Sequence, residues 1–280
     1  MISTYNVNMR IYMECIPCIL NQGIRTIRKV TDNSGKQWEI TRKMIYAVNN
    51  VDVNVSPFEL AIIINSIIKE SVGNNDPYLK DKNDHNNKIL DIYGEIEEKV
   101  NKAENRLMES IKYSICGNRI DLGIFPTIDI SNVLEMCNNI ILEDKYLDLF
   151  KKELNISNNI LFITDNAGEI IFDKILINIL KEMGKSVYLG VRKFPIINDI
   201  TAEDAIGLGF NNNEIIPIGL ENMEIVDNYD LIISKGQANF ELYHKRNNVI
   251  FLFIVKCAIL AKALNVPIYS IYFDKFGDDL

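Results

Sequence analysis

The chain has 280 residues, of which 48% are hydrophobic and 24% are charged, and its formal net charge is −8. This composition is ordinary for a globular protein, and the length allows one large core or two unequal lobes. Acidic residues outnumber basic residues and no basic tract occurs. Nucleic acid is therefore disfavoured as a partner, since neutralising its phosphates needs a positive face.

No run approaches about 18 uninterrupted apolar residues, so we predict no membrane span and no membrane partner. Residues 1–6 lack the basic and then apolar blocks of a signal peptide. We therefore expect a cytoplasmic protein. The sequence does not decide between a monomer and an oligomer.

The N-terminal part, about residues 10–117, shows helix-period apolar positions and few strand signals. A first helix is predicted over 11–30 and a second over 58–72. The second has a clear start signal, namely an N-cap serine, a proline and a glutamate at N3: Ser56, Pro57 and Glu59. A longer helix is predicted over 87–115, and the polar stretch over 80–87 before it is either an exposed connection or a frayed first turn.

After about residue 138 the pattern changes to alternating strands and helices. Strands are predicted over 160–164, 186–191, 214–218, 231–234, 249–255 and 267–272. Helices are predicted over 168–183, 201–208, 240–245 and 256–264. This alternation predicts an α/β fold with a mainly parallel sheet covered on both faces. We place the boundary between an all-helical lobe, 1–125, and an α/β domain, 126–280.

Polar residues follow several predicted strands, where open α/β sheets place their ligands. Asp165 and Asn166 follow the strand over 160–164, and Asp199 follows the next strand along the chain. Such oxygen donors suit a hard cation such as Mg²⁺ or Mn²⁺. The alternative is that these residues only cap the helices that follow them.

A lysine–glycine turn, Lys235-Gly236, follows the strand over 231–234. Together with the acidic residues it suits a metal-assisted phosphate site, in which carboxylates hold the cation and a lysine neutralises phosphoryl oxygens. The alternative for Lys235 is a solvated turn lysine. Three such groups at one sheet edge favour the functional interpretation.

Cys15 and Cys18 form a CxxC pair within a helical pattern. A structural zinc site needs four ligands, and the sequence has neither a second CxxC nor paired histidines. A redox pair of the thioredoxin kind lies at a strand-to-helix turn. We favour passive thiols here over metal or redox use. The five cysteines form no disulfide framework, and Cys116 and Cys257 are expected to be packing residues.

Four stretches in this order resemble the damage-control phosphatase family, formerly domain of unknown function 89 and also labelled an acidic-residue methyltransferase-like metal-binding domain. They are Glu14-Cys15-Ile16-Pro17-Cys18, Gly117-Asn118-Arg119-Ile120-Asp121, Asp165-Asn166-Ala167-Gly168-Glu169 and Lys235-Gly236-Gln237-Ala238-Asn239-Phe240-Glu241. The double cysteine is similar to that of the short, stand-alone microbial branch. The resemblance implies a helical lobe beside an α/β/α sandwich.

The resemblance also implies a divalent ion (Mg, Mn, Co or Ni) held by Asp165, Asn166 and Asp199. It further implies a pocket for a small phosphorylated metabolite, bordered by Lys235, Asn118, Asp121 and Asn239. Family members act on sugar phosphates and on phosphopantetheine-type metabolites, some of them damaged metabolites, and the sequence does not choose among these substrates.

The implied reaction is hydrolysis of a phosphate monoester. The attacking group is either a water molecule beside the cation or the Asp165 carboxylate. Glu169 is a candidate proton donor to the leaving oxygen, although an acidic residue in a first helical turn needs no catalytic role. Asp165, Glu169 and Lys235 are thus the candidate catalytic residues.

Two other functions remain open. A carboxyl methyltransferase agrees with the second family label, but no glycine-rich loop follows the first predicted strand. A non-catalytic metal-binding or metabolite-binding protein would need the same ligands without turnover.

Overall fold

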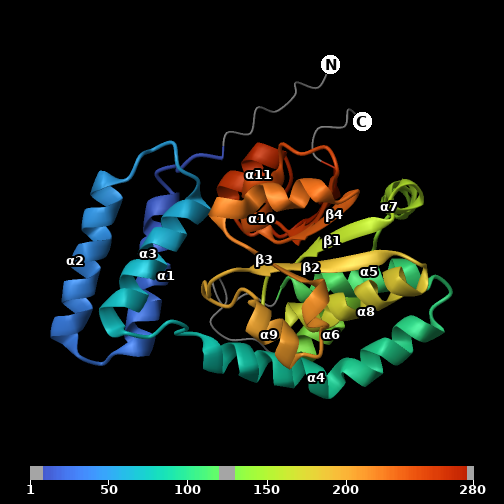
Figure 1. Ribbon diagram of the computed structural model, residues 1–280, viewed down its shortest axis with the longest axis horizontal. Helices are drawn as coiled ribbons and strands as arrows, with labels where there is room; N and C mark the ends of the chain where they lie inside the picture. Colours follow the sequence, from blue (N-terminus) through green and yellow to red (C-terminus); the bar gives the residue numbers. More distant parts are fainter. Residues whose placement is uncertain (1–8, 120–129, 276–280) are drawn as a thin grey trace.

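The computed structural model of the chain describes residues 9–119 and 130–275 (Figure 1). A six-stranded sheet lies in its α/β part, with the strand order β3-β2-β1-β4-β5-β6. Its strands are β1 (Asn159–Ile163), β2 (Ser186–Arg192), β3 (Ile215–Ile218), β4 (Leu231–Lys235), β5 (Val249–Ile254) and β6 (Ile271–Asp274). The first five strands are parallel and only β6 is antiparallel, so the predicted mainly parallel sheet is confirmed.

Helices cover both faces of the sheet (Figure 1). Ile160 and Phe162 of β1 pack into the cluster on the face of α4 (Leu79–Lys102), α5 (Arg106–Gly117) and α8 (Glu169–Glu182). Leu161 and Ile163 pack on the opposite face with α10 (Gln237–Tyr243) and α11 (Ala258–Leu264). Because both faces are buried, the strands are nearly continuous apolar runs. The predicted α/β/α arrangement is confirmed.

Three N-terminal helices form a hydrophobic cluster of their own: α1 (Cys15–Val30), α2 (Ser34–Asn50) and α3 (Pro57–Val72). The predicted start of α3 is confirmed by a capping box, in which the Ser56 hydroxyl accepts from Glu59 N at 3.1 Å and Ser56 N donates to the Glu59 carboxylate at 2.6 Å. Helices α4 and α5 instead share the large cluster beneath the sheet. The chain division at residue 125 stays a prediction.

Several predicted element bounds were wrong. The helix predicted over 11–30 begins at Cys15, and α2 begins at Ser34, where no helix was predicted. Residues 80–87 form the first turns of α4 and not an exposed connection, and Lys82 among them is fully buried. The helix predicted over 87–115 is two helices, because Asn105 caps α5 by accepting from Met108 N at 3.0 Å.

The remaining helices connect these elements. They are α6 (Ile130–Asn138), α7 (Asp144–Ile156), α9 (Ala202–Gly207) and the 3-10 helices η1 (Asn212–Glu214) and η2 (Leu220–Asn228). Helices α6 and α7 and the antiparallel direction of β6 were not foreseen from the sequence. None of the helices in the described part of the chain is both long and apolar enough to span a membrane.

The cysteines differ from expectation at one position. Cys116 was predicted to be a packing residue, but it forms a disulfide with Cys137 that joins α5 to α6, with an S–S distance of 2.08 Å. Cys15 is buried in the first turn of α1, and burial raises the pKa of its thiol. A raised thiol pKa lowers the fraction of reactive thiolate, in agreement with a passive role.

Candidate active site

The three predicted metal ligands lie at the carboxyl ends of β1 and β2. Residues 165–167 run antiparallel to residues 198–200, with a bridge between Asn166 and Asp199. Ala167 N donates to Asn198 O at 2.8 Å, and Ile200 N donates to Asp165 O at 3.0 Å. These backbone bonds fix the two segments side by side, so side chains 34 positions apart in sequence lie at one edge of the sheet.

Asp165 lies against Gly236, the residue that precedes α10. Gly236 has a φ of +78°, and a Cβ at this position would lie 2.1 Å from the Asp165 carboxylate oxygen Oδ2. Any other residue would displace the carboxylate and strain the backbone. The lysine–glycine turn found in the sequence therefore makes room for Asp165.

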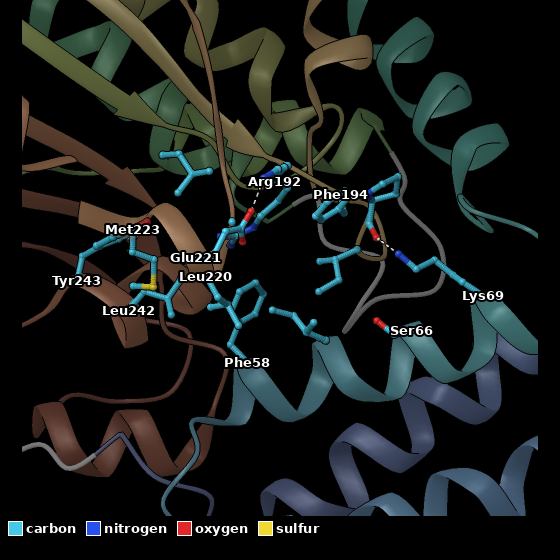
Figure 2. Close-up of a pocket in the computed structure, with 16 residues that line it drawn as sticks. Phe58, Ser66, Lys69, Arg192, Phe194, Leu220, Glu221, Met223, Leu242 and Tyr243 are labelled. Carbon is cyan, nitrogen blue, oxygen red and sulfur yellow. Dashed lines mark hydrogen bonds and ion pairs between the residues drawn. The ribbon is translucent and has the colours of Figure 1, made fainter. Parts of the chain in front are cut away.

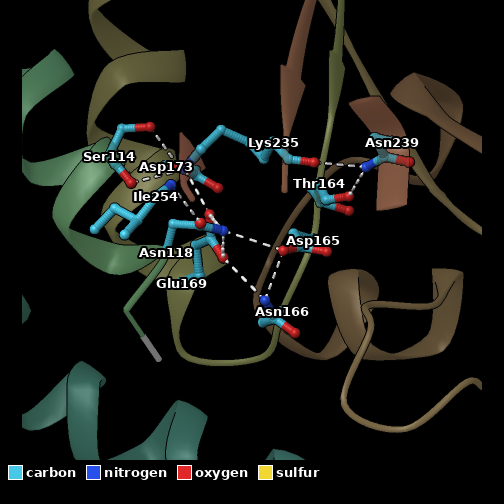
Figure 3. A network of polar contacts seen from close by, with 10 residues as sticks. All are labelled: Ser114, Asn118, Thr164, Asp165, Asn166, Glu169, Asp173, Lys235, Asn239 and Ile254. Atoms are coloured by element: carbon cyan, nitrogen blue, oxygen red, sulfur yellow. Dashed lines mark hydrogen bonds and ion pairs between the residues drawn. The ribbon is translucent and has the colours of Figure 1, made fainter. Parts of the chain in front are cut away.

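Asn118, at the end of α5, joins the acidic residues (Figure 3). Its Nδ2 donates to the Asp165 carboxylate at 3.1 Å and to both Glu169 oxygens at 3.0 Å. Its Oδ1 accepts from Ile254 N at 3.0 Å. The Asn166 amide also donates to Asp165, at 2.7 Å, and to Glu169, at 3.3 Å. The Asp165 carboxylate is thus held by two amides.

Lys235 is fully buried and does not lie in a solvated turn. Its Nζ contacts Glu169 Oε1 at 2.6 Å, Asp173 Oδ1 at 2.7 Å and Ser114 O at 2.7 Å. An ammonium group has three hydrogens, so these three acceptors occupy all of them. Burial opposes the charge, but Asp173 and Glu169 outweigh it and raise the pKa of Lys235. The lysine therefore points into an internal cluster of carboxylates.

Asp173 and Ser114 belong to this network, and the sequence analysis did not predict them as site residues. Burial raises the pKa of Asp173 to about 7, with opposing effects from Lys235 and from the Ser114 hydroxyl, which donates to it at 2.6 Å. Asp173 lies four residues after Glu169 on α8, a spacing that places both on one helix face. That spacing was the available signal. No sequence signal pointed to Ser114.

Arg192, at the end of β2, was also missed. Its Nε donates to Asp199 Oδ2 at 2.7 Å, and its guanidinium lies 4.4 Å from the centre of the Phe58 ring. Burial lowers the pKa of Arg192, but Asp199 more than offsets this and the net shift is upward. The arginine stays charged and places a cation beside a predicted metal ligand.

The other predicted substrate-binding residues divide into two cases. Asn239 Nδ2 donates to Thr164 O at 3.0 Å and to Lys235 O at 2.8 Å, so it joins the ends of β1 and β4 (Figure 3). Its Oδ1 is buried and has no hydrogen-bond partner within the described part of the chain. Asp121 lies outside the described residues.

The donor set at the sheet edge fits a hard divalent cation. Asp165 and Asp199 offer carboxylates and Asn166 an amide oxygen, which are the ligand types that Mg²⁺ and Mn²⁺ prefer. Within the described residues, 9–119 and 130–275, no group of three or more His, Cys, Asp or Glu side chains is arranged to hold a metal ion. The predicted set has only two such residues, so its third ligand would have to be the Asn166 amide.

Comparison with known proteins agrees with the resemblance seen in the sequence. The family model described as "Damage-control phosphatase ARMT1-like domain" matches residues 11–271. A damage-control phosphatase of Pyrococcus horikoshii is 32% identical, with 92% of this chain and 96% of the relative covered. An uncharacterized protein of Methanocaldococcus jannaschii is 29% identical, with 93% and 94% covered.

The fold has a counterpart among solved structures. The crystal structure of a DUF89 family protein from Pyrococcus horikoshii superimposes with a TM-score of 0.81 at 26% sequence identity. The match covers 96% of this chain and 99% of the other. The similarity therefore includes the helical lobe as well as the sheet.

Proposed function

Because the chain belongs to the damage-control phosphatase ARMT1-like domain family, we propose that it is a divalent-metal-dependent phosphatase of small metabolites. The substrate class is the phosphate monoester, including those of damaged metabolites. The observation that carries the proposal is the oxygen-donor group of Asp165, Asn166 and Asp199 at the carboxyl ends of β1 and β2. The ion is Mg²⁺, Mn²⁺, Co²⁺ or Ni²⁺.

Phosphate monoesters hydrolyse very slowly without a catalyst, so the site must stabilise negative charge on the phosphoryl oxygens. A bound divalent ion supplies Lewis-acid polarisation and positioning of the phosphate. The protein itself holds the Asp165 carboxylate in a fixed orientation. Asp165 Oδ2 accepts from Asn118 and Asn166, and Gly236 leaves room for the carboxylate. Preorganised groups need no rearrangement when charge develops.

Glu169 acts as a hydrogen-bond acceptor in each of these contacts. Its oxygens accept from Asn118, Asn166 and the Lys235 ammonium. This arrangement supports a positioning role, in which Glu169 orients the two amides that hold Asp165. Proton donation by Glu169 stays a prediction, and the attacking group is a water molecule or the Asp165 carboxylate.

Lys235 has two candidate roles. In the network described above it compensates the charges of Glu169 and Asp173. The predicted role, neutralising a phosphoryl oxygen, requires the ammonium to exchange one of its three present acceptors for the substrate. Both roles reduce turnover when the lysine is removed, and in both the removal costs stability in the free protein, because the three contacts are present there.

Phosphate release from a panel of phosphorylated metabolites tests the proposed function. The protein is stripped with a chelator and then supplied with Mg²⁺, Mn²⁺, Co²⁺ or Ni²⁺ in turn. We expect release only with added metal and none from the Asp165→Asn variant. A non-catalytic binding protein would bind the metal without release, and a methyltransferase would release no phosphate.

A further inference from the structure

A pocket adjoins the candidate metal ligands. It has a volume of about 260 Å³ and lies between α3, the segments that follow β2 and β3, and α10. Figure 2 shows Phe58, Ser66 and Lys69 on the α3 side, with Leu242 and Tyr243 on the opposite side. This volume is slightly below the range for small-molecule sites, which is roughly 300–1,000 Å³, so it suits a small ligand.

One side chain belongs to both the pocket and the candidate metal site. Arg192 lines the pocket, while its Nε donates to Asp199 at 2.7 Å. A ligand in the pocket is therefore separated from Asp199 by a single guanidinium group. Arg192 thus connects the pocket to the strand-end carboxylate of Asp199.

Two buried donors in the pocket wall have no hydrogen-bond partner among the residues that the structure describes. They are Arg192 Nη2 and the Tyr243 hydroxyl, on side chains that are 8% and 1% exposed. Burial raises the pKa of Tyr243, against the opposing charge of Arg192, so the hydroxyl keeps its proton. An unsatisfied buried donor destabilises the free protein, and a ligand that accepts from it removes this cost.

The rest of the pocket wall is mostly apolar. Its charged side chains are already engaged, because Lys69 Nζ donates to Pro195 O at 2.9 Å and Lys193 pairs with Glu221. Apolar side chains make up most of the remainder: Phe58, Ile62, Ile196, Ile218, Met223 and Leu242. A hydroxyl group buried against such a wall would lose its hydrogen bonds to water without replacement.

We infer that this pocket, the leaving-group pocket, takes the organic part of the phosphate ester, and that this part is a compact apolar alcohol. Its phosphate end lies at Arg192 Nη2 and the Tyr243 hydroxyl, next to Asp199. The inference rests on the proposed phosphatase function and specifies its substrate class. Esters of densely hydroxylated sugars are disfavoured, because the apolar wall offers few partners for their hydroxyls.

A matched pair of esters tests the inference. Cyclohexylmethyl phosphate has the six-membered ring and exocyclic carbon of glucose 6-phosphate without the hydroxyls or the ring oxygen. We expect kcat/KM to be at least about tenfold higher for the cyclohexyl ester, which corresponds to about 1.4 kcal/mol. Equal values, or a preference for the sugar ester, would overturn the inference while the phosphatase assignment stands.

Substitutions on α3 test whether the preference for the cyclohexylmethyl ester arises in the leaving-group pocket. Ile62 lines the pocket, whereas its neighbour Ile63 does not and is 37% exposed. We expect Ile62→Trp to fill the pocket and to lower the ratio of the two kcat/KM values by roughly tenfold. Ile63→Trp adds the same side chain outside the pocket and should keep the ratio. An unchanged ratio in Ile62→Trp would place the organic part elsewhere.

Binding of the corresponding phosphonates, which cannot be hydrolysed, separates this inference from the proposed function. Calorimetry with Mn²⁺ present should show tighter binding of the cyclohexylmethyl analogue. Tyr243→Phe should weaken it by roughly three- to tenfold without lowering Tm, since the free hydroxyl has no partner to lose. If no ester of the metabolite panel releases phosphate either, the proposed function fails, and the phosphonate preference alone decides the inference about the pocket. Equal affinities for the two phosphonates would then contradict the inference about the leaving-group pocket.

Discussion

Two lysines, Lys82 and Lys235, are both fully buried, and each contacts two carboxylates. Lys82 lies 2.6 Å from Asp76 and 2.5 Å from Asp204. Lys235 lies 2.6 Å from Glu169 and 2.7 Å from Asp173. The two clusters are alike in charge and in the burial of the lysine, so burial of charge by itself does not identify a functional site.

The difference lies in what each cluster is connected to. Asp204 accepts from the backbone and the hydroxyl of Thr201, so the Lys82 cluster joins α4 to the start of α9. Glu169 is connected through Asn118 and Asn166 to Asp165 at the open edge of the sheet. We therefore assign the Lys82 cluster to stability, and the Lys235 cluster to both stability and the orientation of Asp165.

The largest effect is expected at Asp165, the residue that distinguishes the two clusters. Asp165→Ala should reduce phosphate release to background, and Asp165→Asn should be nearly as damaging because it keeps the shape and removes the charge. The fold should persist, since Asp165 makes few apolar contacts. Mn²⁺ affinity measured by calorimetry should fall in parallel. Near-normal turnover in Asp165→Ala would show that the metal assignment is wrong.

Replacing each lysine by methionine tests the comparison directly. Lys235→Met leaves two buried carboxylates without their cation, and Lys82→Met leaves the buried Asp204 and the partly exposed Asp76 without theirs. Each variant should therefore lose about 3–5 kcal/mol of unfolding free energy. Lys235→Met should also lose roughly two to three powers of ten in turnover. Lys82→Met should keep most of its turnover.

Turnover of both variants is measured at a temperature where circular dichroism shows each to be folded. Lys235→Arg provides a folded counterpart and should recover only part of the activity, because a planar guanidinium does not replace a compact ammonium. Equal loss of turnover at the two lysines would remove the distinction between the clusters.

Asn118 connects Glu169 of the Lys235 cluster to Asp165 at the sheet edge. Asn118→Ala frees Asp165 and Glu169 from a shared donor and leaves Ile254 N without its acceptor. We expect a fall in turnover of roughly 10–100-fold and a stability loss of about 1–3 kcal/mol. Steady-state kinetics and urea unfolding measure the two effects. A stability loss with unchanged turnover would make Asn118 purely structural.

The acid–base behaviour of Asp173 gives a smaller, pH-dependent effect. Its pKa is raised from an ordinary value of 3.8 to about 7, so the folded chain binds this proton more tightly than the unfolded chain. Its contribution to stability is present below about pH 4 and is lost as the pH rises to about 7. In urea unfolding at pH 4, 5.5 and 7, the stability of the wild type relative to Asp173→Asn should therefore decrease with pH. A constant difference would contradict the raised pKa.

The smallest effect is expected at the CxxC pair, which lies outside both clusters. Replacing Cys15 and Cys18 together with serine should leave phosphate release within about tenfold of the wild type if the thiols are passive. The zinc content of the purified protein is measured alongside. Loss of bound zinc together with loss of activity would make the pair a metal site.

The sequence by itself determined features that depend on local patterns. The capping box of Ser56 and Glu59 fixed the start of α3, because both partners lie within one helical turn. The strand–helix alternation fixed the sheet, and the turn residues placed Asp165, Asp199 and Lys235 at the ends of their strands. That these residues share one edge followed from the parallel direction of the strands.

Only the tertiary structure decided which partners these residues have. Lys235 contacts Glu169, Asp173 and the carbonyl of Ser114, which lies 121 positions away. The approach of Arg192 to Phe58 and the Cys116–Cys137 disulfide likewise depend on how distant segments pack. A charged side chain in the sequence has many possible partners. Which of them it contacts depends on which groups are buried next to it, because an unpaired charge in the interior is too costly to persist.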